Sequence, residues 1–436
     1  MRGNLILIIA AFIFNFSEVS SQEIKLISLE EVLSKVATNN QTNKIAEKEV
    51  YAAKADFNQT NAFLLPSLTV SHSGISTTNP LMAFGSKLNQ EILTQADFNP
   101  ALLNDPDQIQ NFTTKVELKQ PLFNADGLFY RKAAKLKMNA YELQATRTKE
   151  GINLEVAKTY MQLQVAYKAI EVLKKAKETA FENKKLATNN FEQGYMQKSD
   201  LLLVEMYVNE VENQLVTAQS SLVNTSNLLY YLMGEENEAV LKPSEELVSV
   251  AQLTSNDITL SENRADFEAL EKSTEAYTAM HKGNKLSYLP RLNAFGTYEM
   301  YDDQLFNTSA KGYLVGAQLS WDVFQGFQRI GKIQKSKAEL DKAEITLDQY
   351  KNQSTIEFKA AKRQLTDAQN KLNLANLSVE QSKEAYRIRK NRYDQGLEKT
   401  TDLLQSETQS LQKQLEQLQA VFNYNFTQAY VTFLSK

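Results

Sequence analysis

The segment FEQGYMQKSDLL at residues 191–202 returns as YDQGLEKTTDLL at residues 393–404, and this repeat indicates how the whole chain is organised. Both copies carry a glycine, Gly194 or Gly396, at the same position, and neither copy contains proline. Glycine readily takes the left-handed backbone conformation that closes the C-terminus of a helix. We therefore predict a tight turn between two helices at each glycine.

Polar residues that favour helix N-termini follow each glycine. Ser199 and Thr401 are expected to be the N-caps of the returning helices, because their hydroxyl groups accept hydrogen bonds from free backbone N–H groups. Asp200 and Asp402 come directly afterwards and complement the positive end of the helix dipole. Each copy is thus predicted to form a helical hairpin.

Other markers recur in the same order along the chain. The tetrapeptide LPSL at 65–68 returns as LPRL at 289–292, at an offset of 224 residues. Further on, Leu118 matches Leu319 at an offset of 201 residues. The offset falls by 23 residues between these markers, so the first copy carries extra residues there.

The repeat divides the chain into two copies of one order: helix, strand, loop, strand, long helix, tight turn, long helix. The first copy is expected to span 22–234, with its strand pair in 65–123 and its turn near 194. A linker is expected at 235–261. The second copy is expected to span 262–436, with its strand pair in 289–324 and its turn near 396.

The predicted strands alternate in polarity. In residues 313–322 one face is apolar and consists of Tyr313, Val315, Ala317, Leu319 and Trp321. The first copy sets Val116 and Leu118 against Lys115, Glu117 and Lys119. Charges on one side only suit a wall between lipid and water, although a half-buried strand of a soluble sheet would show the same alternation.

Two proline-free segments, from Gly127 to Asn190 and from Phe327 to the C-terminus, predict very long helices. At 1.5 Å per residue, about 65 residues make a helix of roughly 100 Å, which no compact domain accommodates. Apolar residues step by three and four along the helices, as in a coiled coil. These seams are Val156, Tyr160, Leu163, Tyr167 and Ile170; Leu201, Val204, Val208, Val211, Leu215, Ala218 and Leu222; and Leu404, Thr408, Leu411, Leu415, Leu418 and Phe422.

Residues 1–21 are predicted to be a secretory signal peptide. Arg2 supplies the positive start, the apolar core runs from Leu5 to Phe16, and small or permissive residues precede Gln22. The core is too short for a spanning helix, and an uncleaved anchor is the alternative interpretation. No other segment approaches 18 consecutive apolar residues, but strands of a membrane β-barrel would escape such a search.

Composition excludes several classes of function. The 48 basic and 52 acidic residues nearly balance, and no basic tract indicates a nucleic-acid partner. Cysteine is absent and only two histidines occur, so neither a thiolate nucleophile nor a Cys- or His-based metal site is expected. Because the carboxylates are scattered over helix faces, no acid/base pair stands out, and we expect neither an enzyme nor a cofactor.

Two strand pairs supply only four strands, which cannot enclose a usable lumen. Open sheet edges are not tolerated in lipid, so neighbouring copies of the chain would have to close the barrel. Three copies would give 12 strands, and two copies would give eight, whose interior is filled by side chains. The residues themselves leave this number open.

The paired strands and hairpins, the Leu-Pro-x-Leu entries and the Gly-x4-[Ser/Thr]-Asp-Leu-Leu turns resemble the TolC-like outer-membrane efflux proteins. The resemblance covers about Glu23 to Lys436. It implies an α+β membrane protein, mostly α, that forms a homotrimer with a 12-stranded outer-membrane β-barrel. This barrel would continue into a long periplasmic α-helical barrel of coiled-coil hairpins. The implied partners are a periplasmic adaptor, an inner-membrane pump and outer-membrane lipid, with substrates exported through the lumen.

The resemblance also implies functional residues. Family members dock their adaptor at the hairpin turns, which assigns the docking tips to Gly194, Ser199, Asp200, Gly396, Thr401 and Asp402. The family constricts the periplasmic end with lumen-facing aspartates, and Asp402 matches the first of these. Because Gln405 stands where a second acidic residue can occur, and Glu398 where a basic partner can, at most a single ring of Asp402 is implied.

A periplasmic coiled-coil adaptor or structural protein without a membrane barrel is the alternative function. An adaptor would show compact β-domains around one hairpin rather than two strand pairs. The cargo is not readable from the sequence, since drug efflux, metal efflux and protein secretion use similar ducts.

Overall fold

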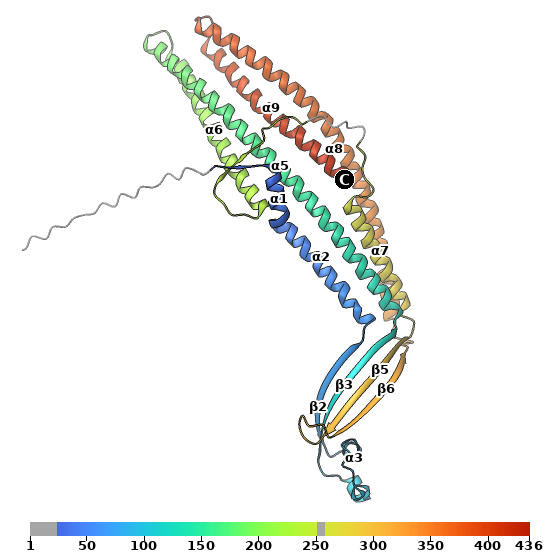
Figure 1. The fold of residues 1–436 in the computed structure, drawn as a ribbon. Helices are drawn as coiled ribbons and strands as arrows, with labels where there is room; N and C mark the ends of the chain where they lie inside the picture. Colours follow the sequence, from blue (N-terminus) through green and yellow to red (C-terminus); the bar gives the residue numbers. More distant parts are fainter. Residues whose placement is uncertain (1–23, 251–257) are drawn as a thin grey trace, which may run out of the picture. The chain divides into compact units, whose positions relative to one another are not determined.

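The structure, a computed structural model, describes residues 24–250 and 258–436, and most of them are helical (Figure 1). The predicted signal peptide, residues 1–21, lies outside the described residues, as does part of the predicted linker, 235–261. The chain divides into two compact units. Unit 1 comprises Met1–Gln41, Glu150–Ile258 and Lys359–Phe433, and unit 2 comprises Thr42–Lys149, Thr259–Phe358 and Leu434–Lys436.

A four-stranded antiparallel sheet belongs to unit 2 (Figure 1). Its strands, in spatial order, are β2 (Ser67–Thr77), β3 (Ile109–Phe123), β5 (Arg291–Asp302) and β6 (Ala310–Ser320). Each repeat copy contributes two strands, and the copies join where β3 pairs with β5. Strands β2 and β6 are the edges, so within the described chain each has a single neighbour.

The register of pairing sorts the side chains of the sheet onto two unlike faces. One row crosses all four strands as Val70, Val116, Tyr298 and Tyr313, which makes that face apolar. The opposite face carries ion pairs of the central strands: Lys115 with Glu117 at 3.6 Å, Lys115 with Glu299 at 3.7 Å, and Lys119 with Glu117 at 3.0 Å. The predicted alternation of polarity is confirmed.

Neither face of strand β6 is covered within one chain. Every residue of β6 after Ala310 is exposed, including Val315 at 69% and Leu314 at 59%. The strand ends at Ser320, so the prediction that Trp321 continues its apolar face is wrong. The indole Nε1 of Trp321 instead donates to the carbonyl oxygen of Tyr288 at 2.9 Å, because the chain has already left the ladder there.

The connection between β2 and β3, expected to be an irregular loop, contains two helices. They are α3 (Pro80–Asn89) and α4 (Pro100–Asn104). An Asn-Pro pair begins each of them: the side chain of Asn79 accepts from Met82 N–H at 3.2 Å, and that of Asn99 accepts from Ala101 N–H at 3.0 Å. Both Asn-Pro pairs are helix-start signals that are visible in the sequence, although the loop prediction did not use them.

The prediction of very long helices is confirmed. Helix α5 (Ala125–Glu192) has 68 residues and α8 (Gln328–Asp394) has 67, and both contribute residues to each unit. The returning helices, α6 (Lys198–Met233) and α9 (Thr400–Ser435), have only 36 residues each. In unit 2, α2 (Gln41–Gln59) and α7 (Ala265–Leu286) complete the helices, and Ala133 of α5 packs there against Ala276 and Ala279 of α7.

The coiled-coil seams form the apolar core of unit 1. Val156 and Leu163 of α5 and Val211 of α6 are each 0% exposed. The prediction fails at Thr408 of α9, which is exposed. Helix α9 instead turns Glu407 inward together with serines, so its buried stripe is partly polar.

A short parallel pair of strands in unit 1 was not predicted. It joins β1 (Ile24–Ile27) to β4 (Val240–Pro243), which lies inside the predicted linker. Helix α1 (Leu29–Asn39) follows β1, and Ser28 caps it by accepting from Glu31 N–H at 3.1 Å. Four-residue strands with partners some 200 positions away give no periodic signal.

Candidate functional site at the hairpin turns

Both glycine turns have the geometry that the sequence predicts. The backbone φ angle is +77° at Gly194 and +74° at Gly396, in the left-handed region. In the first turn, Gly194 N–H donates to Phe191 at 3.0 Å and Tyr195 N–H donates to Asn190 at 2.8 Å. The second turn repeats both bonds at 2.9 Å, so each glycine closes the C-terminus of a long helix.

The predicted N-caps are wrong. Helix α6 begins at Lys198 with Gln197 as its N-cap residue, so Ser199 already lies inside the first turn. Helix α9 begins at Thr400, which places Thr401 inside its first turn as well. In each case the backbone carbonyl of the residue before the helix already accepts the first N–H groups, since Asp200 N–H reaches Gln197 at 3.1 Å.

The two aspartates do lie in the first turns of the returning helices, where the helix dipole favours a negative charge. Asp402 has a further neighbour, because Arg389 of α8 lies 4.0 Å from its carboxylate. The side chain of Asp402 is 43% exposed, so its charge remains partly hydrated.

An ion-pair cluster in the second turn was missed by sequence reasoning. The Glu398 carboxylate forms ion pairs with Arg389 and Arg392, each at 2.8 Å, and the Glu398 side chain is only 13% exposed. Both arginines come from the last turns of α8, so the pairs hold the turn against its own helix.

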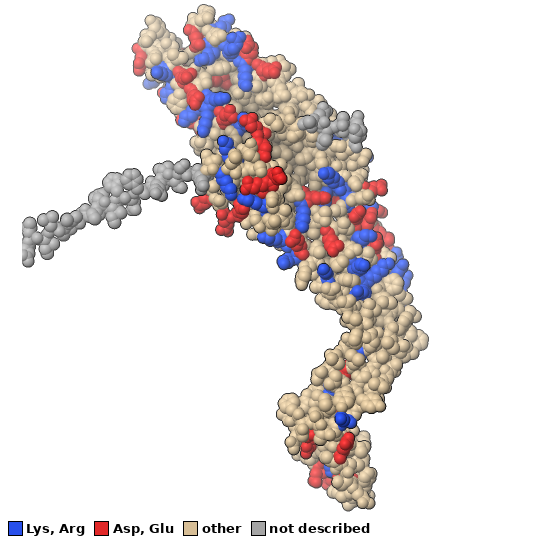
Figure 2. Space-filling view, in the orientation of Figure 1, with Lys and Arg blue, Asp and Glu red and all other residues tan. Residues whose placement is uncertain are grey.

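An apolar side chain directly follows each glycine and points into solvent. Tyr195 is 83% exposed and Leu397 is 64% exposed. On the face shown in Figure 2, acidic and basic side chains intermingle over the hairpin helices, while the strands are mostly covered by uncharged side chains. Each hairpin thus ends in a tight turn whose residue after the glycine is apolar and exposed.

Within the described ranges, 24–250 and 258–436, no group of three or more His, Cys, Asp or Glu side chains could hold a metal ion. None of the helices in these ranges is both long and apolar enough to cross a membrane.

The fold is shared with solved outer-membrane channels. The Campylobacter jejuni CmeC outer membrane channel superposes with a TM-score of 0.81 at 18% identity, over 93% of this chain and 85% of that one. The outer membrane protein VceC of Vibrio cholerae gives a TM-score of 0.77 at 17% identity, over 93% and 96% of the two chains. The open state of the Neisseria gonorrhoeae MtrE outer membrane channel gives 0.75 at 14% identity, over 93% and 88%. No curated protein sequence matches the chain.

Strand pairs joined to long helical hairpins thus define a channel protein of the TolC-like class. The chain belongs to the outer membrane efflux protein family, whose model matches residues 32–235 and 259–433. It is therefore located in the outer membrane and extends into the periplasm. It is an outer-membrane efflux channel, and its family consists of channels rather than enzymes.

Proposed function

We propose that the protein is the outer-membrane duct of a tripartite export system. Three copies form a 12-stranded barrel that continues into a helical tube, and substrates delivered by an inner-membrane pump and a periplasmic adaptor leave passively through the lumen. The observation that carries this proposal is a four-stranded sheet with two edges and two unlike faces.

The edges of the sheet support closure by neighbouring copies. A strand at the edge of a sheet presents unpaired N–H and C=O groups, which lipid cannot satisfy. Pairing β6 of one copy with β2 of the next removes every edge when the ring closes. Three copies leave a lumen, whereas eight strands from two copies would be filled by side chains.

The faces of the sheet support a wall between lipid and water. The apolar row through Val116 and Tyr298 suits contact with lipid, and the ion-paired face with Lys115 and Glu117 suits a hydrated lumen. A half-buried sheet of a soluble protein would also have two unlike faces, but a core would cover the apolar one, whereas Val70, Tyr313 and Val315 are all exposed within the described chain.

A matched pair of substitutions on β6 tests this assignment. Val315 and Leu314 are neighbours, are similarly exposed and point to opposite faces. Val315→Arg is expected to cost about 2–4 kcal/mol near the bilayer midplane and to reduce the heat-modifiable trimer in the outer-membrane fraction, whereas Leu314→Arg is tolerated. Cell fractionation with unheated and heated gel samples gives the measurement.

Two outcomes would contradict the duct. Equal tolerance of both substitutions would mean that Val315 does not face lipid. A wild-type chain recovered as a soluble periplasmic monomer would favour the alternative, a coiled-coil adaptor or structural protein without a barrel.

We assign the docking of the adaptor to the two turns, Gly194–Asp200 and Gly396–Asp402. The exposed Tyr195 and Leu397 lie directly at the turns, where they offer apolar anchors to a partner. The left-handed glycines, with their backbone hydrogen bonds, place these anchors at the ends of the hairpins.

We further propose that Asp402 constricts the periplasmic end as a ring of three carboxylates. Asp402→Ala should then raise single-channel conductance in planar bilayers, because removal of the side chains widens the passage and removes their field. Asp200→Ala, at the matching position of the first hairpin, serves as the control. An unchanged current in the Asp402 variant would leave Asp402 only its favourable position at a helix N-terminus.

A further inference from the structure

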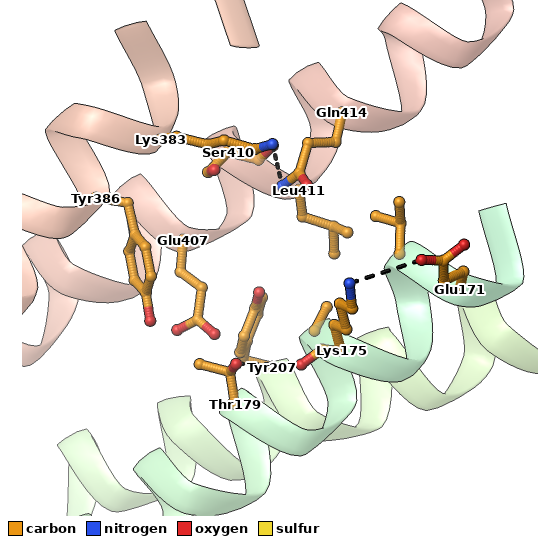
Figure 3. A pocket seen from close by; sticks show the side chains of 12 residues that line it. Glu171, Lys175, Thr179, Tyr207, Lys383, Tyr386, Glu407, Ser410, Leu411 and Gln414 are labelled. Carbon is orange, nitrogen blue, oxygen red and sulfur yellow. Dashed lines mark hydrogen bonds and ion pairs between the residues drawn. The ribbon is translucent and has the colours of Figure 1, made fainter. Parts of the chain in front are cut away.

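A pocket of about 430 Å³ with a mixed polar and apolar lining lies between the two hairpins of unit 1, and all four hairpin helices line it (Figure 3). Helix α5 contributes Thr179, α6 contributes Tyr207, α8 contributes Tyr386 and α9 contributes Glu407. Figure 3 shows Tyr386 and Glu407 of the second hairpin facing Tyr207 of the first. Neither the docking turns nor the proposed Asp402 ring includes these residues.

Glu407 is the unusual residue of this pocket because it is only 5% exposed. Asn183 of α5 donates from Nδ2 to Glu407 Oε2 at 2.8 Å, which joins the first hairpin to the second. The same asparagine accepts from Lys390 of α8 at 3.4 Å. Within the described chain Glu407 Oε1 has no hydrogen-bond partner, and neither does the hydroxyl of Tyr207.

The charges around Glu407 do not neutralise it. The titratable groups that line the pocket or adjoin it are Glu171 and Lys175 of α5, Tyr207 of α6, and Lys383, Tyr386 and Lys390 of α8. Lys175 pairs with Glu171 at 3.6 Å, and no ion pair within the described residues joins a cation to Glu407. A buried carboxylate without a paired cation is costly when charged.

Burial raises the pKa of Glu407 to about 7, against the smaller opposing effects of the Asn183 hydrogen bond and the Lys390 charge. Burial, together with the nearby carboxylate, also raises the pKa of Tyr207, which therefore stays neutral. Glu407 is thus the group of this pocket that changes charge near neutral pH.

We propose that Glu407 is a proton-dependent latch: while protonated it keeps the two hairpins together, and once ionised it drives them apart. Separation of the hairpins hydrates the carboxylate and returns its pKa towards the ordinary value of 4.5. The joined arrangement therefore binds the proton more tightly, and acid favours it. The free-energy advantage of the joined arrangement over the separated one is complete below about pH 4.5 and is lost as the pH rises through about 7.

A distance measurement on the protein tests the latch directly. The chain has no cysteine, so spin labels at Asn189→Cys on α5 and Thr408→Cys on α9 report the separation of the hairpins without further changes. Both positions are exposed and uncharged. With labelled chains diluted into unlabelled ones, we expect a longer or broader distance distribution at pH 8 than at pH 5, with a midpoint near pH 7.

Two variants separate the latch from a merely structural role. Glu407→Gln keeps an acceptor for Asn183 but cannot ionise, so the short distance should persist at both pH values. Glu416→Gln removes an exposed carboxylate of the same helix and should keep the wild-type response. A wild-type distance that does not change with pH, or a shift that survives Glu407→Gln, overturns the proposal.

The latch rests on the proposed function only in one respect: if the protein is a duct, its conductance should rise with pH. If the protein conducts but the distance between the spin labels does not change with pH, the latch is disproved and the duct stands. If the distance changes with pH but the protein does not conduct, the duct is disproved and the latch stands.

Discussion

Replacement of Asp266 by alanine should lower the free energy of unfolding by about 3–5 kcal/mol, since it leaves a buried cation unpaired. Arg264, just before helix α7, is 2% exposed, and its guanidinium binds both carboxylate oxygens of Asp266. Tyr350 of α8 donates to the same carboxylate at 2.8 Å, and Arg147 of α5 lies 3.5 Å away. Asp266 therefore ties three helices of unit 2 together.

Urea unfolding of the purified protein, followed by circular dichroism, measures this loss. Glu275→Ala is the matched control, because Glu275 lies on the same helix and forms an exposed pair with Lys272 at 2.9 Å. Exposed pairs contribute about 0–1 kcal/mol. Similar small losses in both variants would show that the buried cluster does not hold the helices.

Acid should weaken the same cluster. Burial would raise the pKa of Asp266, but hydrogen bonds from Arg264 and Tyr350 outweigh burial and hold it below the ordinary value of 3.8. A carboxylate with a lowered pKa contributes stability above its ordinary pKa and loses it as the pH falls through the value in the folded state. The difference in the free energy of unfolding between the wild type and Asp266→Ala should therefore become smaller below about pH 4.

Gly396→Leu should abolish at least nine-tenths of export while trimers persist in the outer membrane. The φ angle of +74° makes a side chain at this position cost about 1–2 kcal/mol, but a Cβ would meet no atom within 4 Å. The fold should therefore survive. If the turn docks an adaptor, a leucine side chain placed there would disturb the contact surface beside Leu397.

Gly326→Leu provides the matched control for this variant. Gly326 has a φ angle of +57° and equally open surroundings, but it lies between β6 and α8 rather than at a hairpin turn. A substrate-efflux assay in cells that also express the pump and adaptor gives the comparison. Equal loss of export in both variants would point to backbone strain, and unchanged export in Gly396→Leu would remove the docking assignment.

Sequence reasoning located the hairpin turns well because their signals are local. A glycine of positive φ can close a helix without any distant partner, and the polar helix-start residues that follow Gly194 and Gly396 made both turns identifiable. The N-caps failed because the first free N–H groups of a helix can donate to several acceptors, so a hydroxyl does not fix where the helix begins. Helix α6 begins before Ser199, and the N–H groups of Asp200 and Leu201 donate to the backbone carbonyl of Gln197.

The buried polar groups of the two units could not have been predicted in the same way. Glu407 and Asn183 are 224 positions apart, and on a helical wheel Glu407 looks like one more solvated carboxylate among many. Its burial follows from the packing of α9 against the other hairpin, which also turned Thr408 outward. A heptad pattern specifies which stripe of a helix is apolar but not how far the helix rotates against its partner.

The duplicated order, the long helices, their turns and the alternating strands could all be predicted from local sequence, because each depends on neighbours a few residues away. The pairing of β3 with β5, the place of α2 and α7 in unit 2, and the burial of Glu407 and Asp266 emerge only when the chain is folded. These features join segments far apart in the chain, and they are selected by how whole surfaces pack rather than by the preference of any residue for its local conformation.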